Sequence, residues 1–341
     1  MNQAEPRAGV MQEREIFTRE FDDPDAYTVA NGLFSARVPG ALPSFRARVT
    51  RADLGRVKVR IGEASSAVTM IGGIPNLHAF SFSIRDSAPR MLSGHEVSHG
   101  KIFHHRPNDI MFGHSPSGRP WPFATIALHF PTLAEAGASF GGRSLSPPRD
   151  DARLFDASAP AFQRLLTLLK DAQRVTMANP MIGMADASSR ALSGVLLDGL
   201  LDCMERGEAR HDRAAQRRHR RVVTRLDQVL MERPEQTMCL ADMCSEIGVS
   251  HRTLHMACQE FLGMSAMRYA RMRRLDTVRE ALKQSDPRRA SVTDIAMRFG
   301  FWELDRFAAA YRQRFGEPPS STLRRDFDWR GSGSSHVRET M

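Results

Sequence analysis

The sequence predicts an α+β protein with an N-terminal small β-barrel or jelly roll, a helical hairpin, and a C-terminal all-α domain with two helix-turn-helix units. Three observations support this fold class. Apolar and polar residues alternate in short runs between residues 45 and 130, as in strands that bury one face. Two longer stretches with helical periodicity follow. Beyond residue 240, a small residue is twice followed four positions later by glycine, which suits a tight turn between packed helices.

The N-terminal region is predicted to be mainly β-structure. The first 40 residues show no clear period, apart from a short helix expected near residues 23–31. Strands separated by glycine, proline and asparagine turns are expected at residues 45–50, 57–61, 68–71, 79–84, 110–112 and 125–130. Many short strands with frequent turns favour a barrel or a jelly roll.

Two amphipathic helices are expected after the strands. Their apolar stripes are Phe162, Leu165, Leu166, Leu169 and Ala172 in the first helix, and Leu192, Val195, Leu196, Leu200 and Met204 in the second. The dipeptide Asn179-Pro180 separates them. We interpret this hairpin as a dimerisation surface, although the same stripes would also form if both helices only cover the β-domain.

The first helix-turn-helix unit is predicted around residues 240–250. Cys244 is the small residue at the helix contact, and Gly248 is the turn residue. Ser250 can cap the helix that follows, which makes this helix a candidate recognition helix. Its outward side chains are Arg252, His255 and Met256.

The second unit repeats the pattern around residues 294–301. Ala296 and Gly300 occupy the positions of the small residue and the turn glycine. Phe307 and Tyr311 mark the buried face of a second candidate recognition helix. The outward side chains of that helix are Glu303, Asp305 and Arg306.

A long amphipathic helix at residues 265–282 is expected to connect the two units. Its apolar face is Met267, Ala270, Leu275, Val278 and Leu282, and its basic side is Arg268, Arg271, Arg273 and Arg274. A rigid spacer of this kind can place two recognition helices in successive major grooves on one face of DNA, about 34 Å apart.

These patterns indicate binding to double-stranded DNA. Arginine can form two hydrogen bonds to guanine, which suits it to direct base contact. The alternative interpretation is that each candidate is an ordinary solvated surface residue. The candidate base contacts are Ser250, His251, Arg252, His255, Met256, Glu303, Asp305 and Arg306, and the candidate phosphate contacts are Arg271, Arg274 and Arg312.

The charge distribution favours the same interpretation. The chain has a formal net charge of +9. Residues 206–330 hold 25 basic and 17 acidic residues, against 23 and 22 in the rest of the chain. Positive charge is therefore concentrated where attraction to phosphate requires it.

The C-terminal sequence resembles the DNA-binding domain of the AraC/XylS family over residues 221–326. Cys258 stands where the family usually has phenylalanine, and Ala266 where it usually has proline. The resemblance implies seven helices with two helix-turn-helix units, in a regulator that activates or represses transcription with DNA and RNA polymerase as partners. A cupin-like β-domain often precedes this domain in the family. The matching blocks are residues 248–254, 261–263, 274–275, 294–301, 306–307, 311–312 and 315–319.

The predicted organisation is a sensor or dimerisation domain, a charged linker, an AraC-type DNA-binding domain and a disordered polar tail. Their ranges are 1–205, 206–220, 221–327 and 328–341. A homodimer and a small-molecule effector are the further partners considered. The chain lacks an apolar stretch of about 20 residues and an N-terminal apolar signal core, so a cytoplasmic protein without a membrane partner is expected.

Histidines of the β-region suggest a competing hypothesis, a cupin-like metalloenzyme fused to a DNA-binding domain. Their spacing does not fit cupin ligands, and adjacent histidines in a strand face opposite sides. We therefore assign no catalytic residue, cofactor or metal site, and expect no enzyme activity. The histidines are His95, His99, His104, His105 and His114. Two further alternatives stay open: a domain that only oligomerises, or an effector site walled by His78, Phe80, Phe82, Trp121 and Phe123.

Overall fold

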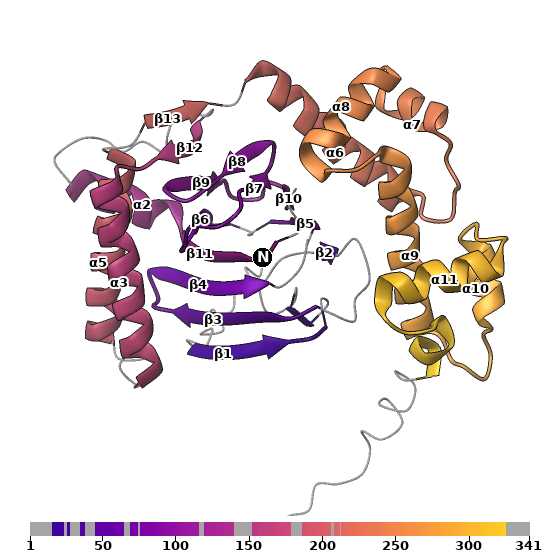
Figure 1. Cartoon of the computed structure of the whole chain (residues 1–341), viewed down its shortest axis with the longest axis horizontal. Helices are drawn as coiled ribbons and strands as arrows, with labels where there is room; N and C mark the ends of the chain where they lie inside the picture. The colour runs from indigo at the N-terminus through magenta and orange to yellow at the C-terminus, as the bar shows by residue number, and fades with distance from the viewer. Residues whose placement is uncertain are drawn as a thin grey trace, which may run out of the picture.

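The structure, a computed structural model, consists of an N-terminal β-domain with covering helices and a C-terminal helical domain (Figure 1). It describes residues 16–23, 26–27, 35–37, 45–64, 69–73, 76–115, 119–139, 152–178, 186–205, 208–211 and 213–324. The predicted tail at 328–341 and most of the helix expected at 23–31 lie outside these residues.

The β-domain contains two antiparallel sheets. The larger has eight strands in the order β1-β3-β4-β11-β6-β9-β12-β13, and the smaller has five in the order β2-β5-β10-β7-β8. Between the described strands no pairing joins the two sheets, so they form an open, jelly-roll-like pair instead of a closed barrel. The strands of the larger sheet are β1 (Ile16–Phe21), β3 (Ala47–Asp53), β4 (Val57–Ala64), β6 (His78–Ser83), β9 (Lys101–His105), β11 (Trp121–Leu128), β12 (Ala152–Asp156) and β13 (Glu208–His211). Those of the smaller are β2 (Ser35–Arg37), β5 (Thr69–Gly72), β7 (Arg90–Leu92), β8 (His95–Val97) and β10 (Met111–His114).

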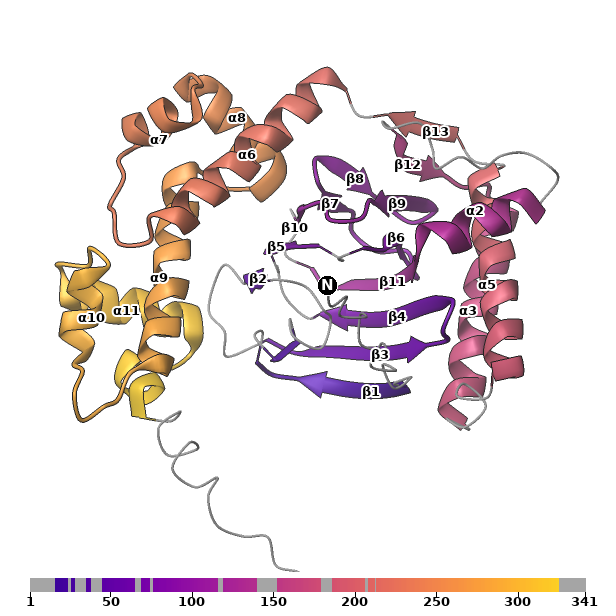
Figure 2. The ribbon, with the colours of Figure 1, turned by 180° about the vertical axis from the view of Figure 1, so that it is seen from behind.

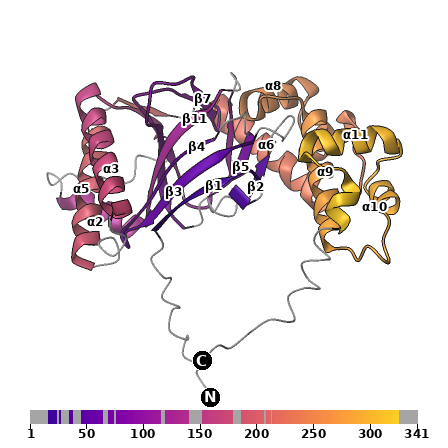
Figure 3. The ribbon, with the colours of Figure 1, turned by 60° about the horizontal axis from the view of Figure 1, so that its bottom comes forward.

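Both faces of the larger sheet are buried, because its strands alternate between two cores. On one face, Val59, Phe82 and Ile126 pack against the helical hairpin of α3 (Ala159–Ala178) and α5 (Asp186–Glu205). On the other, Val49 and Phe103 face the smaller sheet. Figure 3 shows the hairpin on one side of the sheets and the C-terminal helices on the other. The apolar stripes of the hairpin therefore cover the β-domain.

The C-terminal domain has two cores that share one helix. The first core joins α6, α7, α8 and the start of α9, and the second joins the rest of α9 with α10 and α11 (Figure 2). Tyr269 of α9 lies in the first core, and Leu275, Val278 and Leu282 lie in the second. The predicted connecting helix is thus confirmed. The helices are α6 (Ala214–Glu232), α7 (Leu240–Ile247), α8 (His251–Leu262), α9 (Ala266–Gln284), α10 (Val292–Arg298) and α11 (Leu304–Phe315).

The smaller sheet packs directly on the first helix-turn-helix unit. The rings of Phe112 in β10 and Phe261 in α8 meet edge to face, with centroids 6.0 Å apart. His114 Nδ1 donates to the carbonyl oxygen of Phe261 at 3.2 Å, and Gln216 Nε2 donates to that of Gly94 at 3.0 Å. Phe112 and Phe261 belong to one buried cluster, so the two domains share a core.

Several elements differ from the sequence-based expectations. Strands β1 and β2 lie in the region expected to be irregular, and β7, β8, β9, β12 and helix α2 (Phe130–Ser139) were not predicted. Residues 206–220, expected as a linker, contain β13 and the first turns of α6. These strands depend on pairing between distant segments, such as β12 with β13 and β1 with β3, which local alternation does not reveal.

Two residues that were assigned to the apolar faces of helices are exposed instead. Val195 is 47% exposed, because α5 buries the stripe with Leu196 and Leu200 instead. Met267 is 41% exposed, while its neighbour Tyr269 is fully buried. The other four residues predicted for each stripe belong to the cores or pack against them.

Candidate nucleic-acid interface

The first unit has the predicted turn geometry. Gly248 adopts φ 72°, and its N–H donates to the carbonyl oxygens of Cys244 and Ser245. Ser250 Oγ then accepts from the Thr253 N–H at 3.2 Å, which caps α8. The left-handed glycine and the serine cap together fix where α8 begins relative to α7.

The exposed side of α8 carries the first set of predicted contacts. Leu254 and Cys258 are fully buried behind it, and burial raises the pKa of the Cys258 thiol to about 12. The opposite face is therefore free to meet a groove. The predicted base contacts Ser250, His251, Arg252, His255 and Met256 are all exposed.

The second unit is built on Gly300, which adopts φ +75°. Its N–H donates to the Met297 carbonyl, and the next N–H, of Phe301, donates to the Ala296 carbonyl. The predicted base contacts Glu303, Asp305 and Arg306 are exposed at the start of α11. Arg306 Nη1 lies 2.7 Å from Glu303 Oε2, so this arginine is presented on the surface beside an acidic neighbour.

A basic groove of about 490 Å³ lies between α9 and α11. The structure brings together Arg271, predicted to contact phosphate, and Arg306, predicted to contact a base. Arg268 and Gln313 also line this groove, although neither was assigned a contact. Arg312 is exposed on α11 but does not line it.

Arg274, the third predicted phosphate contact, is held within the protein. Its Nη1 donates to Thr237 Oγ1 at 3.0 Å, and its guanidinium lies 5.4 Å from the centre of the Phe301 ring. Burial, followed by the charge of Arg271, lowers its pKa. In this conformation Arg274 supports the turn at Gly300.

Arg273 was predicted on the basic side of α9, where it would contact phosphate or solvent, and this expectation is wrong. Its side chain is largely buried, and its Nε lies 3.0 Å from Asp227 Oδ1. The same carboxylate accepts a hydrogen bond from the hydroxyl of Tyr269. A buried acidic group on α6 thus requires Arg273 as its partner, which periodicity within α9 alone cannot show.

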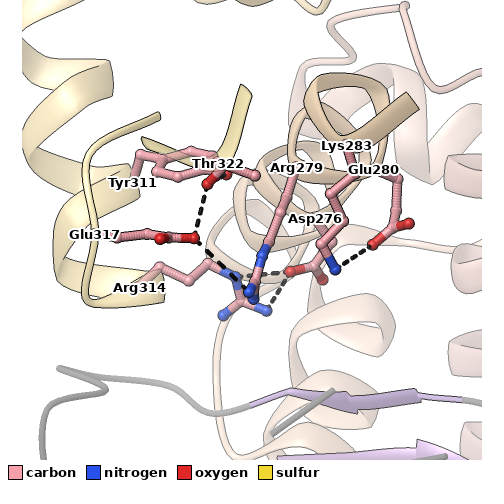
Figure 4. A network of polar contacts seen from close by, with 8 residues as sticks. All are labelled: Asp276, Arg279, Glu280, Lys283, Tyr311, Arg314, Glu317 and Thr322. Atoms are coloured by element: carbon pink, nitrogen blue, oxygen red, sulfur yellow. Dashed lines mark hydrogen bonds and ion pairs between the residues drawn. The ribbon is translucent and has the colours of Figure 1, made fainter. Parts of the chain in front are cut away.

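A polar network fixes α11 relative to α9 (Figure 4). Arg314 donates from Nε and Nη2 to Asp276 Oδ1, at 2.8 and 2.5 Å. On its other side, Tyr311 donates to Thr322 Oγ1, which donates to Glu317 Oε1 at 2.8 Å. Because charge-assisted bonds in a partly buried site are strong, the network holds α11, the second candidate recognition helix, firmly on α9.

Trp302 is an exposed residue that was not among the predicted contacts. Trp302 is 71% exposed and stands between the turn at Gly300 and the start of α11. A tryptophan outside any helical apolar stripe, two residues after a turn glycine, was a signal available in the sequence. Its position beside Glu303 adds an aromatic surface to the second set of predicted contacts.

Three histidines of the β-domain are buried and bonded within it. His78 Nδ1 and His104 Nε2 are 2.9 Å apart, and His105 Nε2 lies 2.9 Å from Ser81 Oγ. Burial lowers the pKa of His104 well below its usual value and that of His105 to about 3. Within the described ranges, no three His, Cys, Asp or Glu residues are grouped so that they could hold a metal ion.

Taken together, the helices define a DNA-binding domain with two helix-turn-helix units on a common spacer. A helix-turn-helix domain family matches residues 243–325. The chain is 39% identical over 90 residues to a probable thc operon regulatory protein from Rhodococcus erythropolis, covering 26% of this chain and 27% of that protein. It is 34% identical over 99 residues to XylDLEGF operon transcriptional activator 2 from Pseudomonas putida, covering 29% and 63%.

Residues 243–325 are thus similar to the helix-turn-helix domains of transcriptional regulators. The matched region spans less than two thirds of the length of either relative. Among solved structures, the AraC-like transcriptional activator CuxR aligns with 77% of this chain and 94% of its own, at 14% identity and a TM-score of 0.42. Within the described residues, no helix is long and apolar enough to span a membrane.

Proposed function

We propose that this protein is a sequence-specific, DNA-binding transcription regulator that contacts two successive major grooves with α8 and α11. One observation supports this most strongly: two helix-turn-helix units, matched in sequence to transcriptional regulators, are joined by the single helix α9. Base contacts would come from Ser250, His251, Arg252, His255 and Met256 of the first unit and from Glu303, Asp305 and Arg306 of the second. Phosphate contacts would come from Arg271 and Arg312, and from Arg274 only when its guanidinium leaves Thr237.

The remaining parts of the proposal concern partners. Since the Pseudomonas putida relative is named a transcriptional activator, we propose activation through RNA polymerase. We also propose a homodimer, formed through the outer surface of the α3–α5 hairpin, where Met177 and Val195 are exposed large apolar side chains. We also propose that the protein is cytoplasmic, because the chromosomal DNA that it would bind in a bacterium lies in the cytoplasm. The β-domain, packed against α8, would act as the effector-responsive part.

The proposal is tested by selecting fragments of genomic DNA with the full chain. We expect a recurring pair of half-sites, and affinity for that site that falls by about a thousandfold or more between 50 and 200 mM salt if at least six phosphates are contacted. Arg48→Ala, at an exposed position on β3, serves as the matched control and should bind as tightly as the wild type. Enrichment of no sequence by the folded chain would contradict the proposal.

A further inference from the structure

A cavity of about 50 Å³ lies between the two sheets of the β-domain. Its wall is mostly apolar and aromatic, but two arginines and a histidine also face it. Of the residues expected to form an effector site, Trp121 and Phe123 line this cavity, whereas Phe80 and Phe82 pack on the opposite face of their sheet. The apolar and aromatic wall is Tyr27, Ala64, Met70, Leu92, Met111, Trp121 and Phe123.

Arg60 is a buried cation in this wall. Arg60 is only 7% exposed, and its Nε has no hydrogen-bond partner. Within the described part of the chain, no carboxylate forms an ion pair with it. Burial, and then the charge of Arg51, lowers its pKa to about 10, so it remains charged at neutral pH. A buried charge without a counter-charge is costly, which makes this position favourable for an anion.

A second buried guanidinium lies across the cavity on the smaller sheet. Arg90 is 2% exposed, and its guanidinium carbon lies 5.1 Å from the centre of the Trp121 ring. The acidic residue among the described lining residues is Asp109, whose Oδ2 is 2.5 Å from Arg153 Nη1. Because Arg153 lies beside Asp109, and burial keeps His105 neutral at pH 7, no carboxylate among the described lining residues is left to balance Arg60.

We propose that this cavity binds a small monocarboxylate with an apolar body. The carboxylate would lie between Arg60 and Arg90, since guanidinium groups match the planar geometry of a carboxylate. The apolar body would contact the Trp121 and Phe123 rings, which stack 5.4 Å apart. The small volume and mostly apolar wall favour a monocarboxylate over a larger, strongly hydrated polyanion. As the signal received by the effector-responsive domain, this ligand rests on the proposed function.

The test compares charged and neutral probes of one shape on the full chain. Melting temperatures are measured with acetate, butyrate and phenylacetate, with their primary amides, and with inorganic phosphate, at constant ionic strength. At ten times its Kd, a bound carboxylate should raise the melting temperature of the full chain by about 2 °C. At least one carboxylate should raise the melting temperature, and the corresponding amide should leave it unchanged. Equal effects of every acid and its amide, or stabilisation by phosphate alone, would overturn the assignment.

Variants identify the group that holds the charge. Arg60→Met should abolish the carboxylate effect and keep or raise the melting temperature of the unliganded chain, because it removes an uncompensated buried charge. Arg60→Gln is the second variant if the first does not fold. Arg48→Met, at an exposed position on β3, is the matched control and should respond like the wild type. A carboxylate effect that persists in the Arg60 variants would place the ligand elsewhere and refute the proposal.

DNA binding of the same samples separates this inference from the proposed function. If no carboxylate acts but the operator is still bound, only the assigned ligand class is wrong. If carboxylates stabilise the chain but it selects no DNA, the proposed function fails and the anion site stands.

Discussion

Replacing Gly300 by alanine tests the turn on which the second helix-turn-helix unit depends. A Cβ at this position would lie 2.1 Å from Thr237 Oγ1. A left-handed backbone conformation costs a residue with a Cβ about 1–2 kcal/mol. The clash would also displace the Thr237 hydroxyl from Arg274 Nη1, now 3.0 Å away, at a cost of about 0.5–1.5 kcal/mol. Gly300→Ala should therefore lower the free energy of unfolding by about 1.5–3.5 kcal/mol.

Gly248→Ala provides the matched control for this change. Gly248 has nearly the same backbone conformation, φ +72°, but open space where a Cβ would stand. Gly248→Ala should therefore lower the free energy of unfolding only by the cost of the left-handed conformation, about 1–2 kcal/mol. The free energies of unfolding of both variants are measured by urea unfolding of the full chain, monitored by circular dichroism at helical wavelengths. In a Thr237→Ala background, Gly300→Ala should cost no more than Gly248→Ala. Equal costs in the wild-type background would refute the close contact between the turn and Thr237.

Three other outcomes are expected. Arg252→Ala and Arg306→Ala should each weaken operator binding by about 1–3 kcal/mol at positions in different half-sites while leaving the melting temperature unchanged; equal loss on all sequences, measured by fluorescence anisotropy, would identify phosphate contacts instead. Phe112→Ala should lower stability by about 3–5 kcal/mol and alter operator affinity, and unchanged affinity would show that the sheet does not influence α8. Stability should fall as the pH decreases from 7 to 5, because His104 and His105 have pKa values lowered by burial and stay neutral while the unfolded chain takes up protons. The loss for His105 is about 2 kcal/mol at pH 5, and a flat urea midpoint over this range would contradict it.

The C-terminal half of the fold could be predicted because its signals are local. Gly248 and Gly300 both adopt the left-handed conformation that their spacing required, and Ser250 caps the helix that it was expected to begin. A turn glycine, a cap and a period of about 3.6 residues all lie within a dozen residues of one another. The type and order of these helices therefore follow from short stretches of sequence.

The β-domain could be predicted only in part, because its signals are not local. Strands β7 and β8 have three residues each, too few to show alternation. The roles of Arg60 and Arg273 likewise depend on partners from other elements. Arg60 lies within an alternating strand and looks like an outward polar residue, yet the second sheet covers that face and buries it. A sequence pattern can show that one face of a strand is polar, but not that another sheet covers it.

The smaller sheet connects the proposed anion site to the first recognition helix. Met111 lines the cavity, and the next residue, Phe112, packs on Phe261 at the end of α8. Adjacent residues in a strand face opposite sides, so a ligand that shifts β10 must act on both faces of the sheet. A ligand that fills the cavity without moving β10 would stabilise the chain and leave DNA binding unchanged. Binding and signalling are therefore separable: Arg60→Met should remove the first, and Phe112→Ala should disrupt the second while carboxylates still bind.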